Sequence, residues 1–301
     1  MKNNSLFMDI LLPLKDLFWK IVPQKIGSRI ITMYFNKKKF KKQDWMLLNL
    51  YVTGKCDLNC IGCNAFAPIA DDYILDIVSF ESDCKRLANL AYGTVTGVGV
   101  IPEIHILGGE PLLHPKLKEI ILIARNYFPA AKLKIVTNGI LLLKCNEDFW
   151  ECCQQNNVDI IISHYPIRLD IKSIRKIAKN YKIQLRYYRG VLPWYKMAFD
   201  LTGGYDADKN FRKCTAALQC VELRDGKIAT CQYILKTVYF NKYFQKDIEI
   251  QETDFIDIYK AKNMDEILEF ISKPVRFCRY CTLKYLPVKW ALSKKDISEW
   301  I

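Results

Sequence analysis

Between residues 47 and 188, short apolar segments alternate with segments of helical periodicity, and this alternation restricts the fold more than any other feature of the chain. The apolar segments, which we expect to be strands, cover residues 47–53, 103–107, 132–137, 158–163 and 183–188. Helical patterns lie between them near 80–92, 115–127, 146–156 and 170–180. Apolar strands separated by helices indicate a parallel sheet that is covered on both faces. The sequence therefore predicts an α/β fold, either a doubly wound sheet or a full or partial (β/α) barrel.

Unusual residues follow the expected strands. Both candidate folds bind their ligands at the carboxyl ends of the strands. In this chain those ends carry Gly108-Gly109-Glu110-Pro111 after the second strand, Asn138 after the third, and Ser163 at the end of the fourth. Two glycines let a backbone approach a ligand closely, and a carboxylate accepts hydrogen bonds from an ammonium group. We therefore expect the functional site at this edge of the sheet.

Composition excludes several classes of protein. Half of the 301 residues are hydrophobic and 26% are charged, as in a folded chain rather than a disordered one. No apolar run reaches the roughly 18 to 20 residues of a spanning helix. Asp9, Pro13 and Lys15 interrupt the region where a signal peptide would be apolar. We therefore expect a cytoplasmic protein whose 12 cysteines serve metal or redox chemistry rather than a disulfide framework.

The first 45 residues carry much of the positive charge. They contain ten Lys and Arg residues against three acids, which gives +7 of the formal +13. Apolar residues recur at helical spacing between Leu6 and Ile21. One interpretation is a helical extension packed on the rest of the protein. The other is a surface that docks on a membrane or an anionic partner, and we expect no nucleic-acid binding.

Three cysteines lie in the loop that leaves the first strand. Cys56, Cys60 and Cys63 have the spacing C-x3-C-x2-C, so one loop can wrap a single iron–sulfur cluster or metal. Zinc prefers four protein ligands in a structural site, and the chain has only three histidines, none of them in this loop. Three thiolates on a [4Fe–4S] cluster leave one iron open to a substrate or cofactor.

The segment from Cys56 to Cys63 resembles the signature of the radical S-adenosylmethionine (SAM) superfamily. The resemblance implies a partial (β/α)6 TIM-type barrel over residues 46–200. It also implies that the open iron binds SAM and that an electron cleaves SAM to a 5′-deoxyadenosyl radical, which abstracts a substrate hydrogen. A flavodoxin- or ferredoxin-type partner would donate that electron. The family often has an aromatic residue before the third cysteine, where this chain has Gly62, so we expect adenine contacts from elsewhere, such as Phe66.

The strand ends extend this resemblance. The segment Gly108-Gly109-Glu110-Pro111 is similar to the family motif that binds the amino group of SAM. Asn138 corresponds to positions near the SAM ribose, with a simple polar turn as the alternative. Ser163 is similar to a serine near the ribose or the carboxylate. The resemblance does not identify a catalytic acid or base.

A second group of cysteines lies beyond residue 200, on both sides of an expected hairpin turn at 224–227 and of a helix expected near 263–272. It resembles the SPASM/twitch extension of part of the superfamily and implies a small auxiliary-cluster α/β domain over residues 201–301. The implied ligands of one auxiliary [4Fe–4S] cluster are Cys214, Cys231, Cys278 and Cys281, and Cys220 is an alternative to Cys214. A zinc site with the same thiolates stays open. We expect the remaining cysteines, 84, 145, 152 and 153, to be small core residues.

The substrate is not specified by these motifs. Relatives with one auxiliary cluster include enzymes that oxidise sugar-like metabolites, and we favour a small molecule such as a sugar or a glycan precursor. One alternative is a maturase of ribosomal peptides. An alternative of another class is a non-catalytic iron–sulfur or zinc protein.

Overall fold

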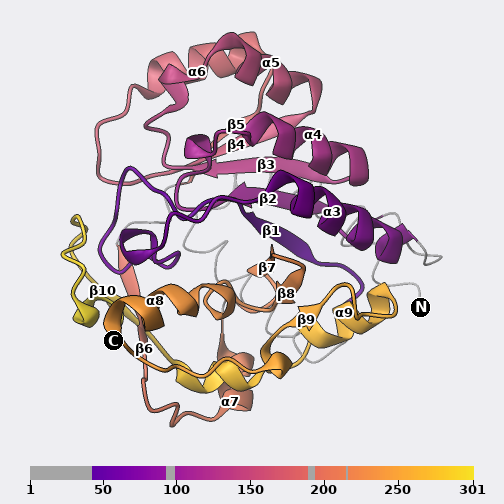
Figure 1. Cartoon of the computed structure of the whole chain (residues 1–301). Helices are drawn as coiled ribbons and strands as arrows, with labels where there is room; N and C mark the ends of the chain where they lie inside the picture. The colour runs from indigo at the N-terminus through magenta and orange to yellow at the C-terminus, as the bar shows by residue number, and fades with distance from the viewer. Residues whose placement is uncertain (1–42, 93–98, 189–193, 215) are drawn as a thin grey trace.

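The computed structural model describes residues 43–92, 99–188, 194–214 and 216–301 (Figure 1). The helical extension expected in residues 1–45 lies almost wholly outside the described residues. Within the described residues, no helix is both long and apolar enough to cross a membrane.

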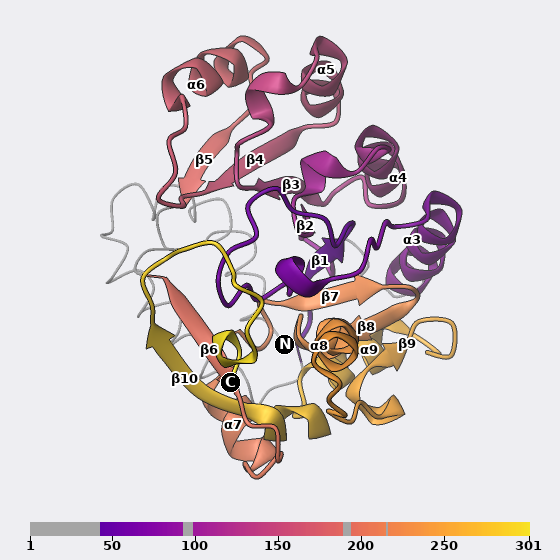
Figure 2. The ribbon, with the colours of Figure 1, turned by 60° about the vertical axis from the view of Figure 1, so that its left-hand side comes forward.

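One eight-stranded sheet forms the centre of the molecule, with the strand order β5-β4-β3-β2-β1-β7-β8-β9 (Figures 1 and 2). Strands β1 to β5 and β7 are parallel, whereas β8 and β9 are antiparallel to their neighbours. The bounds are β1 (Leu47–Tyr51), β2 (Glu103–Leu107), β3 (Lys132–Thr137), β4 (Val158–Ser163), β5 (Leu185–Tyr188), β7 (Val221–Arg224), β8 (Lys227–Ala229) and β9 (Ile256–Asp257). A parallel sheet flanked by helices confirms the predicted α/β class and the partial barrel with a small additional domain.

Helices follow the parallel strands as the periodicity predicted. They are α3 (Ile77–Tyr92), α4 (Leu117–Tyr127), α5 (Glu147–Gln155) and α6 (Ile171–Asn180). The later helices are α7 (Ala207–Lys213), α8 (Thr237–Phe244) and α9 (Met264–Ile271). Helix α3 begins three residues before the expected start at 80, because Asp76 accepts a 2.8 Å hydrogen bond from the Ser79 amide. Single 3-10 turns cover Ala67–Ile69, Pro111–Leu113, Leu142–Lys144, Ile234–Lys236, Glu252–Asp254, Arg276–Tyr280 and Ile297–Glu299.

The two faces of the parallel strands differ. Leu48, Ile104 and Leu133 share one face and belong to the main hydrophobic core together with residues of α3 to α6. Cys84 and Cys153 lie fully buried in this core, as predicted. On the alternate face, the register brings together a polar row across five strands, Glu222, Asn49, His105, Lys134 and Asp159. Polar residues on this face differ from the expectation of two apolar faces, and they are compatible with the inside of an open barrel.

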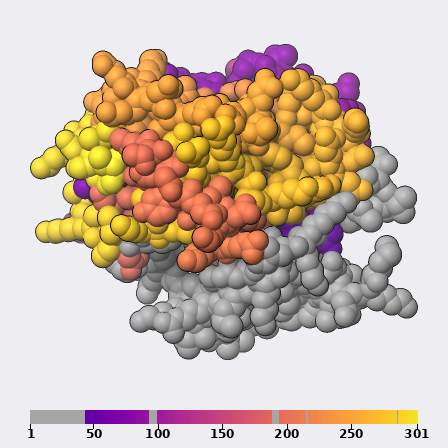
Figure 3. Space-filling model, turned by 90° about the horizontal axis from the view of Figure 1, so that it is seen from below, coloured from indigo at the N-terminus to yellow at the C-terminus, as the bar shows by residue number. Residues whose placement is uncertain are grey.

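Two strands that the sequence did not reveal form a separate sheet. β6 (Tyr195–Phe199) pairs antiparallel with β10 (Cys281–Pro287), across more than eighty residues of chain. We expected all six parallel strands of the partial barrel within residues 46–200. The sixth parallel strand is instead β7, which lies beyond residue 200 and pairs with β1. The proposed domain boundary near 200 stays a prediction, and the main sheet continues past it. Helix α7 packs beside β10, and residues near 210 and near the C-terminus lie side by side in Figure 3.

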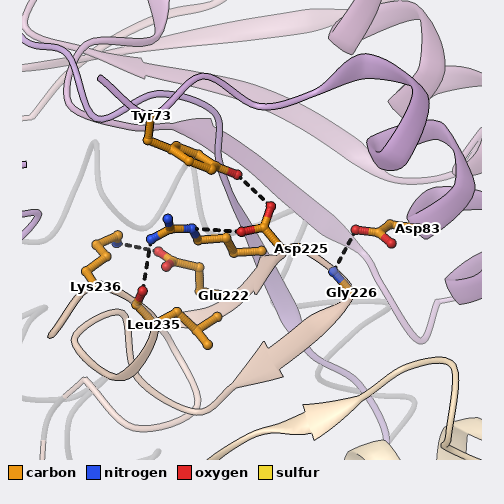
Figure 4. Close-up of polar contacts among 8 residues, drawn as sticks. Tyr73, Asp83, Glu222, Asp225, Gly226, Leu235 and Lys236 are labelled. Atoms are coloured by element: carbon orange, nitrogen blue, oxygen red, sulfur yellow. Dashed lines mark hydrogen bonds and ion pairs between the residues drawn. The ribbon is translucent and has the colours of Figure 1, made fainter. Parts of the chain in front are cut away.

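The predicted hairpin is formed by β7 and β8 of the main sheet, and polar contacts join its turn to Tyr73 and to Asp83 of α3 (Figure 4). Its turn residues Asp225 and Gly226 have φ angles of 50° and 73°, a left-handed conformation that favours glycine. The Gly226 amide donates to Asp83 of α3 at 2.8 Å, and the Tyr73 hydroxyl donates to Asp225 at 3.1 Å. These contacts join the C-terminal part of the chain to the loop and helix that follow the cysteines.

Candidate functional site

The cysteine loop leaves the carboxyl end of β1. Asn59 and Gly62 have φ angles of 46° and 57°, and these two left-handed residues turn the loop around its three thiols. Burial raises the pKa of the Cys56 thiol to about 11 and that of Cys60 to about 12, and the neighbouring Cys63 contributes to both shifts. Thiols in this environment carry their protons when no metal is bound, so metal or cluster binding must release protons.

The glycine pair after β2 packs against the chain that enters this loop. A Cβ on Gly109 would lie 2.2 Å from the Lys55 carbonyl oxygen, and one on Gly108 would lie 2.6 Å from that of Thr53. The Gly109 and Glu110 amides donate to these same two oxygens at 2.7 Å. Side chains at 108 and 109 would therefore push the end of β2 away from the segment directly before Cys56.

Glu110 joins the ends of β2 and β3. Its carboxylate is fully buried and accepts hydrogen bonds from the Thr137 hydroxyl at 2.7 Å, the Asn138 amide at 2.8 Å and the Leu112 amide at 3.1 Å. Burial raises the pKa of Glu110 to about 7, although these three hydrogen bonds oppose the shift. Pro111 follows as the first residue of a 3-10 turn that Glu110 caps. Glu110 thus holds the ends of β2 and β3 together, and the contact of this segment with SAM stays a prediction.

Asn138 connects the end of β3 to the cysteine loop. Its side-chain amide donates to Asp57, next to Cys56, at 2.7 Å, and its side-chain oxygen accepts from the Ile140 amide at 2.9 Å. Ser163 is half-buried at the end of β4. The predicted residues 108–110 thus contact the segment directly before Cys56, and Asn138 contacts Asp57 within the cysteine loop. Ser163 lies at the same edge of the sheet, and Pro111 follows Glu110 in the 3-10 turn.

The expected adenine contact by Phe66 is not supported. Phe66 has no exposed surface and packs among Phe199, Tyr233, Phe240 and Trp300, with ring centroids 5.8 to 6.0 Å apart. A ring enclosed in this way has no face to present to a ligand. The ring, which we expected to contact adenine, instead belongs to the second hydrophobic core.

Sequence reasoning missed the C-terminal segment and its tryptophans. The indole N–H groups of Trp194, Trp290 and Trp300 donate to the loop, to the Ile61 carbonyl at 2.7 Å, the Cys60 sulfur at 3.2 Å and the Cys63 carbonyl at 3.0 Å. Three of the six tryptophans in the chain therefore contact one eight-residue loop. Trp290 and Trp300 stand close together near residue 301, whereas nothing in the sequence around Trp194 pointed to the loop.

The second group of cysteines surrounds a cavity between β6, α7 and β10. Cys214, Cys231, Cys278 and Cys281 line it together with mostly apolar side chains, whereas Cys220 is not among the lining residues. The Asn210 side chain donates to the Cys278 and Cys281 carbonyls at 2.9 and 2.5 Å, which fixes the C-x2-C turn against α7. Burial raises the pKa of Cys278 to about 12 and that of Cys281 to about 11.

Both groups of cysteines have the donor chemistry of an iron–sulfur cluster, because proteins hold such clusters mainly through cysteine thiolates. A zinc ion uses the same thiolates. Among residues 43–92, 99–188, 194–214 and 216–301, no three His, Cys, Asp or Glu side chains form a group that could hold one metal ion.

Comparison with known sequences gives partial matches. No family model matches the chain. The chain is similar to the GTP 3′,8-cyclase of Chlorobaculum tepidum, with 36% identity over 95 residues, 32% of this chain and 26% of that protein. It is also similar to the probable GTP 3′,8-cyclase of Methanothermobacter thermautotrophicus, with 33% identity over 97 residues, 32% of this chain and 28% of that protein. The matched part thus spans less than a third of these curated relatives.

Comparison with solved structures extends over most of the chain. The fold is similar to that of BtrN in complex with AdoMet and 2-DOIA, with a TM-score of 0.52 and 14% identity, over 82% of this chain and 96% of that chain. At this identity the likeness concerns the fold. BtrN and the GTP 3′,8-cyclases are radical SAM enzymes, and this chain has the fold together with the three-cysteine signature. The chain is therefore similar to radical SAM enzymes, in sequence over about a third of its length and in fold over most of it.

Proposed function

We propose that Cys56, Cys60 and Cys63 hold a [4Fe–4S] cluster at which the protein cleaves SAM. The observation that carries this proposal is the convergence of the three-cysteine loop, the glycine pair after β2 and Asn138 after β3 at one edge of the sheet. When bound, the cluster would supply the electron that splits SAM into methionine and a 5′-deoxyadenosyl radical.

The role we assign to the surrounding residues is to hold this edge rigid. Gly109 lets the backbone of β2 lie against Lys55, and Glu110 holds the β3 end through Thr137 and Asn138. Asn138 in turn fixes Asp57 within the loop. We propose that Gly108, Gly109, Glu110 and Pro111 form the wall for the methionine part of SAM and that Asn138 and Ser163 lie toward its ribose.

Electron paramagnetic resonance tests this proposal directly. The protein is reconstituted with iron and sulfide without oxygen, reduced with dithionite, and measured with and without SAM. We expect the spectrum to change on SAM addition, because a cluster with three protein ligands has an open iron. A fully loaded protein whose spectrum ignores SAM would contradict the proposal and favour a non-catalytic iron–sulfur protein.

We further propose that Cys214, Cys231, Cys278 and Cys281 hold an auxiliary cluster. Support comes from the cavity that these four residues share and from the absence of Cys220 from its lining. In a variant with Cys56, Cys60 and Cys63 replaced by Ala, about four irons per chain should remain. Adding Cys214→Ala should remove them, whereas adding Cys220→Ala should not. Zinc in place of iron would refute an auxiliary iron–sulfur site.

For the substrate we propose a small molecule, such as a sugar or a glycan precursor, rather than a ribosomal peptide. BtrN, whose solved complex holds 2-DOIA with AdoMet, is matched over 96% of its length. Candidate substrates carrying deuterium at the reacting carbon should transfer it to 5′-deoxyadenosine. Transfer from a precursor peptide but from no small molecule would favour the peptide alternative. A flavodoxin- or ferredoxin-type donor, a cytoplasmic location and docking through residues 1–45 are further proposals.

A further inference from the structure

The C-terminal segment, residues 288–301, lies directly on the cysteine loop (Figure 2). The Ile61 amide donates to the Ala291 carbonyl at 2.9 Å, and the Ser293 amide donates to the Asn59 carbonyl at 2.9 Å. Cys60 and Leu292 form an antiparallel bridge between these two bonds. The loop is therefore paired, residue by residue, with a segment about 230 positions later in the chain.

A buried carboxylate strengthens this pairing. Glu299 is nearly fully buried and accepts hydrogen bonds from the Gly62 amide at 3.2 Å, the Lys294 amide at 2.7 Å and the Ser293 hydroxyl at 2.6 Å. Hydrogen bonds to a charged acceptor are stronger than neutral ones, and a buried carboxylate without them would be costly. The same side chain thus organises the C-terminal segment and holds the loop at the residue before the third cysteine.

Gly62 makes room for this contact. A Cβ at Gly62 would lie 2.9 Å from the Glu299 carbonyl oxygen and 2.9 Å from the Lys196 Cβ. The aromatic side chain that relatives often have at this position would require that space. The departure of this chain from the family pattern therefore has a structural reason, since the C-terminal segment occupies the place of that side chain.

One contact reaches a cluster ligand itself. The Trp290 indole N–H donates to the Cys60 sulfur at 3.2 Å, whereas Trp194 and Trp300 donate to backbone carbonyls of the same loop. Donors to a ligating sulfur favour the more negative, reduced state of an iron–sulfur cluster and so raise its reduction potential.

We infer that the C-terminal segment is a lock on the SAM-cluster loop, and that Trp290 is a positioning residue that raises the reduction potential of the cluster through the Cys60 sulfur. This inference rests on the proposed cluster at Cys56, Cys60 and Cys63. The lock keeps the loop in its cluster-binding shape, and the indole N–H makes the cluster easier to reduce.

A redox titration of the reconstituted full chain, followed by electron paramagnetic resonance, tests the role of Trp290. The signal to follow is the one that changes on SAM addition, since an auxiliary cluster with four protein ligands would not respond. Trp290→Phe keeps the ring but removes the N–H, so its potential should be lower than that of the wild type. Trp194→Phe, the matched control, loses an N–H bonded to a carbonyl and should leave the potential nearly unchanged. Equal potentials for Trp290→Phe and the wild type would overturn the assignment.

Hydrogen exchange of the cluster-free chain tests the lock separately. Glu299→Gln removes an acceptor charge, and the Ile61 and Gly62 amides should exchange roughly tenfold faster or more in this variant. The amides of β3 serve as the internal reference. Unchanged exchange in the loop would refute the lock. If the wild type holds no SAM-responsive cluster, the proposed function is refuted. The exchange experiment uses the cluster-free chain, so its result is independent of that outcome.

Discussion

A buried ion pair between Lys236 and Glu222 gives the sharpest prediction about stability (Figure 4). Both side chains are 0% exposed, and the Lys236 ammonium lies 2.5 Å from one oxygen of Glu222. The other oxygen has no hydrogen-bond partner among the described residues. The ammonium also lies 4.4 Å from the centre of the Tyr51 ring. Glu222 therefore depends on Lys236 for most of the compensation of its charge.

Replacing Lys236 by Met should leave a buried carboxylate without its partner. Loss of one member of a buried pair typically costs about 3–5 kcal/mol, because the remaining charge cannot be solvated. Burial already raises the pKa of Glu222, and removal of Lys236 raises it further. When a carboxyl has a higher pKa in the folded than in the unfolded state, the protein loses stability as pH rises between these two pKa values. The loss of unfolding free energy caused by Lys236→Met should therefore become smaller as pH falls.

Denaturant unfolding of the reconstituted protein, at about pH 6 and about pH 8, measures this effect. The double variant Lys236→Met with Glu222→Leu should recover most of the lost stability, because it removes both charges. Lys242→Met, at an exposed pair with Asp71 whose side chains are 68% and 51% exposed, should change the unfolding free energy by less than about 1 kcal/mol. If Lys236→Met lowers the unfolding free energy by no more than Lys242→Met does, or by the same amount at both pH values, the reasoning is refuted.

Three further predictions concern the candidate site. Gly62→Ala should destabilise the protein by about 1–3 kcal/mol and lower its iron content, because φ is +57° and the new Cβ would meet atoms at 2.9 Å; thermal unfolding and iron analysis measure both. Burial raises the pKa of Glu110 to about 7, so the unfolding free energy should fall by up to about 3 kcal/mol from about pH 4.5 to about pH 7; this slope should be absent in Glu110→Gln. Asn138→Asp should destabilise by about 1–3 kcal/mol, because it places a second carboxylate in the 2.7 Å contact with Asp57; Asp57→Asn should restore the loss in a denaturation assay.

The strands that carry the candidate site could be predicted because their information is local. β2, β3 and β4 begin and end where continuous apolar segments do, and the glycine pair and Asn138 follow them directly. Cluster chemistry could be proposed for Cys56, Cys60 and Cys63 from their spacing, because three thiols in one loop need no distant partner. The hairpin turn was also visible, since Asp225-Gly226 supplies the left-handed conformation within two residues.

Contacts between distant parts of the chain could not be predicted in the same way. β7 was expected as one strand of a hairpin, but its parallel pairing with β1 could not be predicted, because the two strands are far apart in the sequence. β6 and β10 become strands only by pairing with each other. The burial of Phe66 could not be foreseen, because the aromatic residues that enclose it lie more than 130 positions away. Trp290 is 230 positions from the sulfur that it contacts, so no motif of the loop could reveal it.

Formation of 5′-deoxyadenosine tests the central claim most directly. The reconstituted protein is reduced with dithionite in the presence of SAM, and the products are separated by chromatography. Our account predicts 5′-deoxyadenosine from the wild type and from Cys84→Ala, whose thiol lies in the core, but none from Cys60→Ala. A fully loaded wild type that forms no 5′-deoxyadenosine, or a Cys60→Ala variant that forms as much as the wild type, would contradict the account.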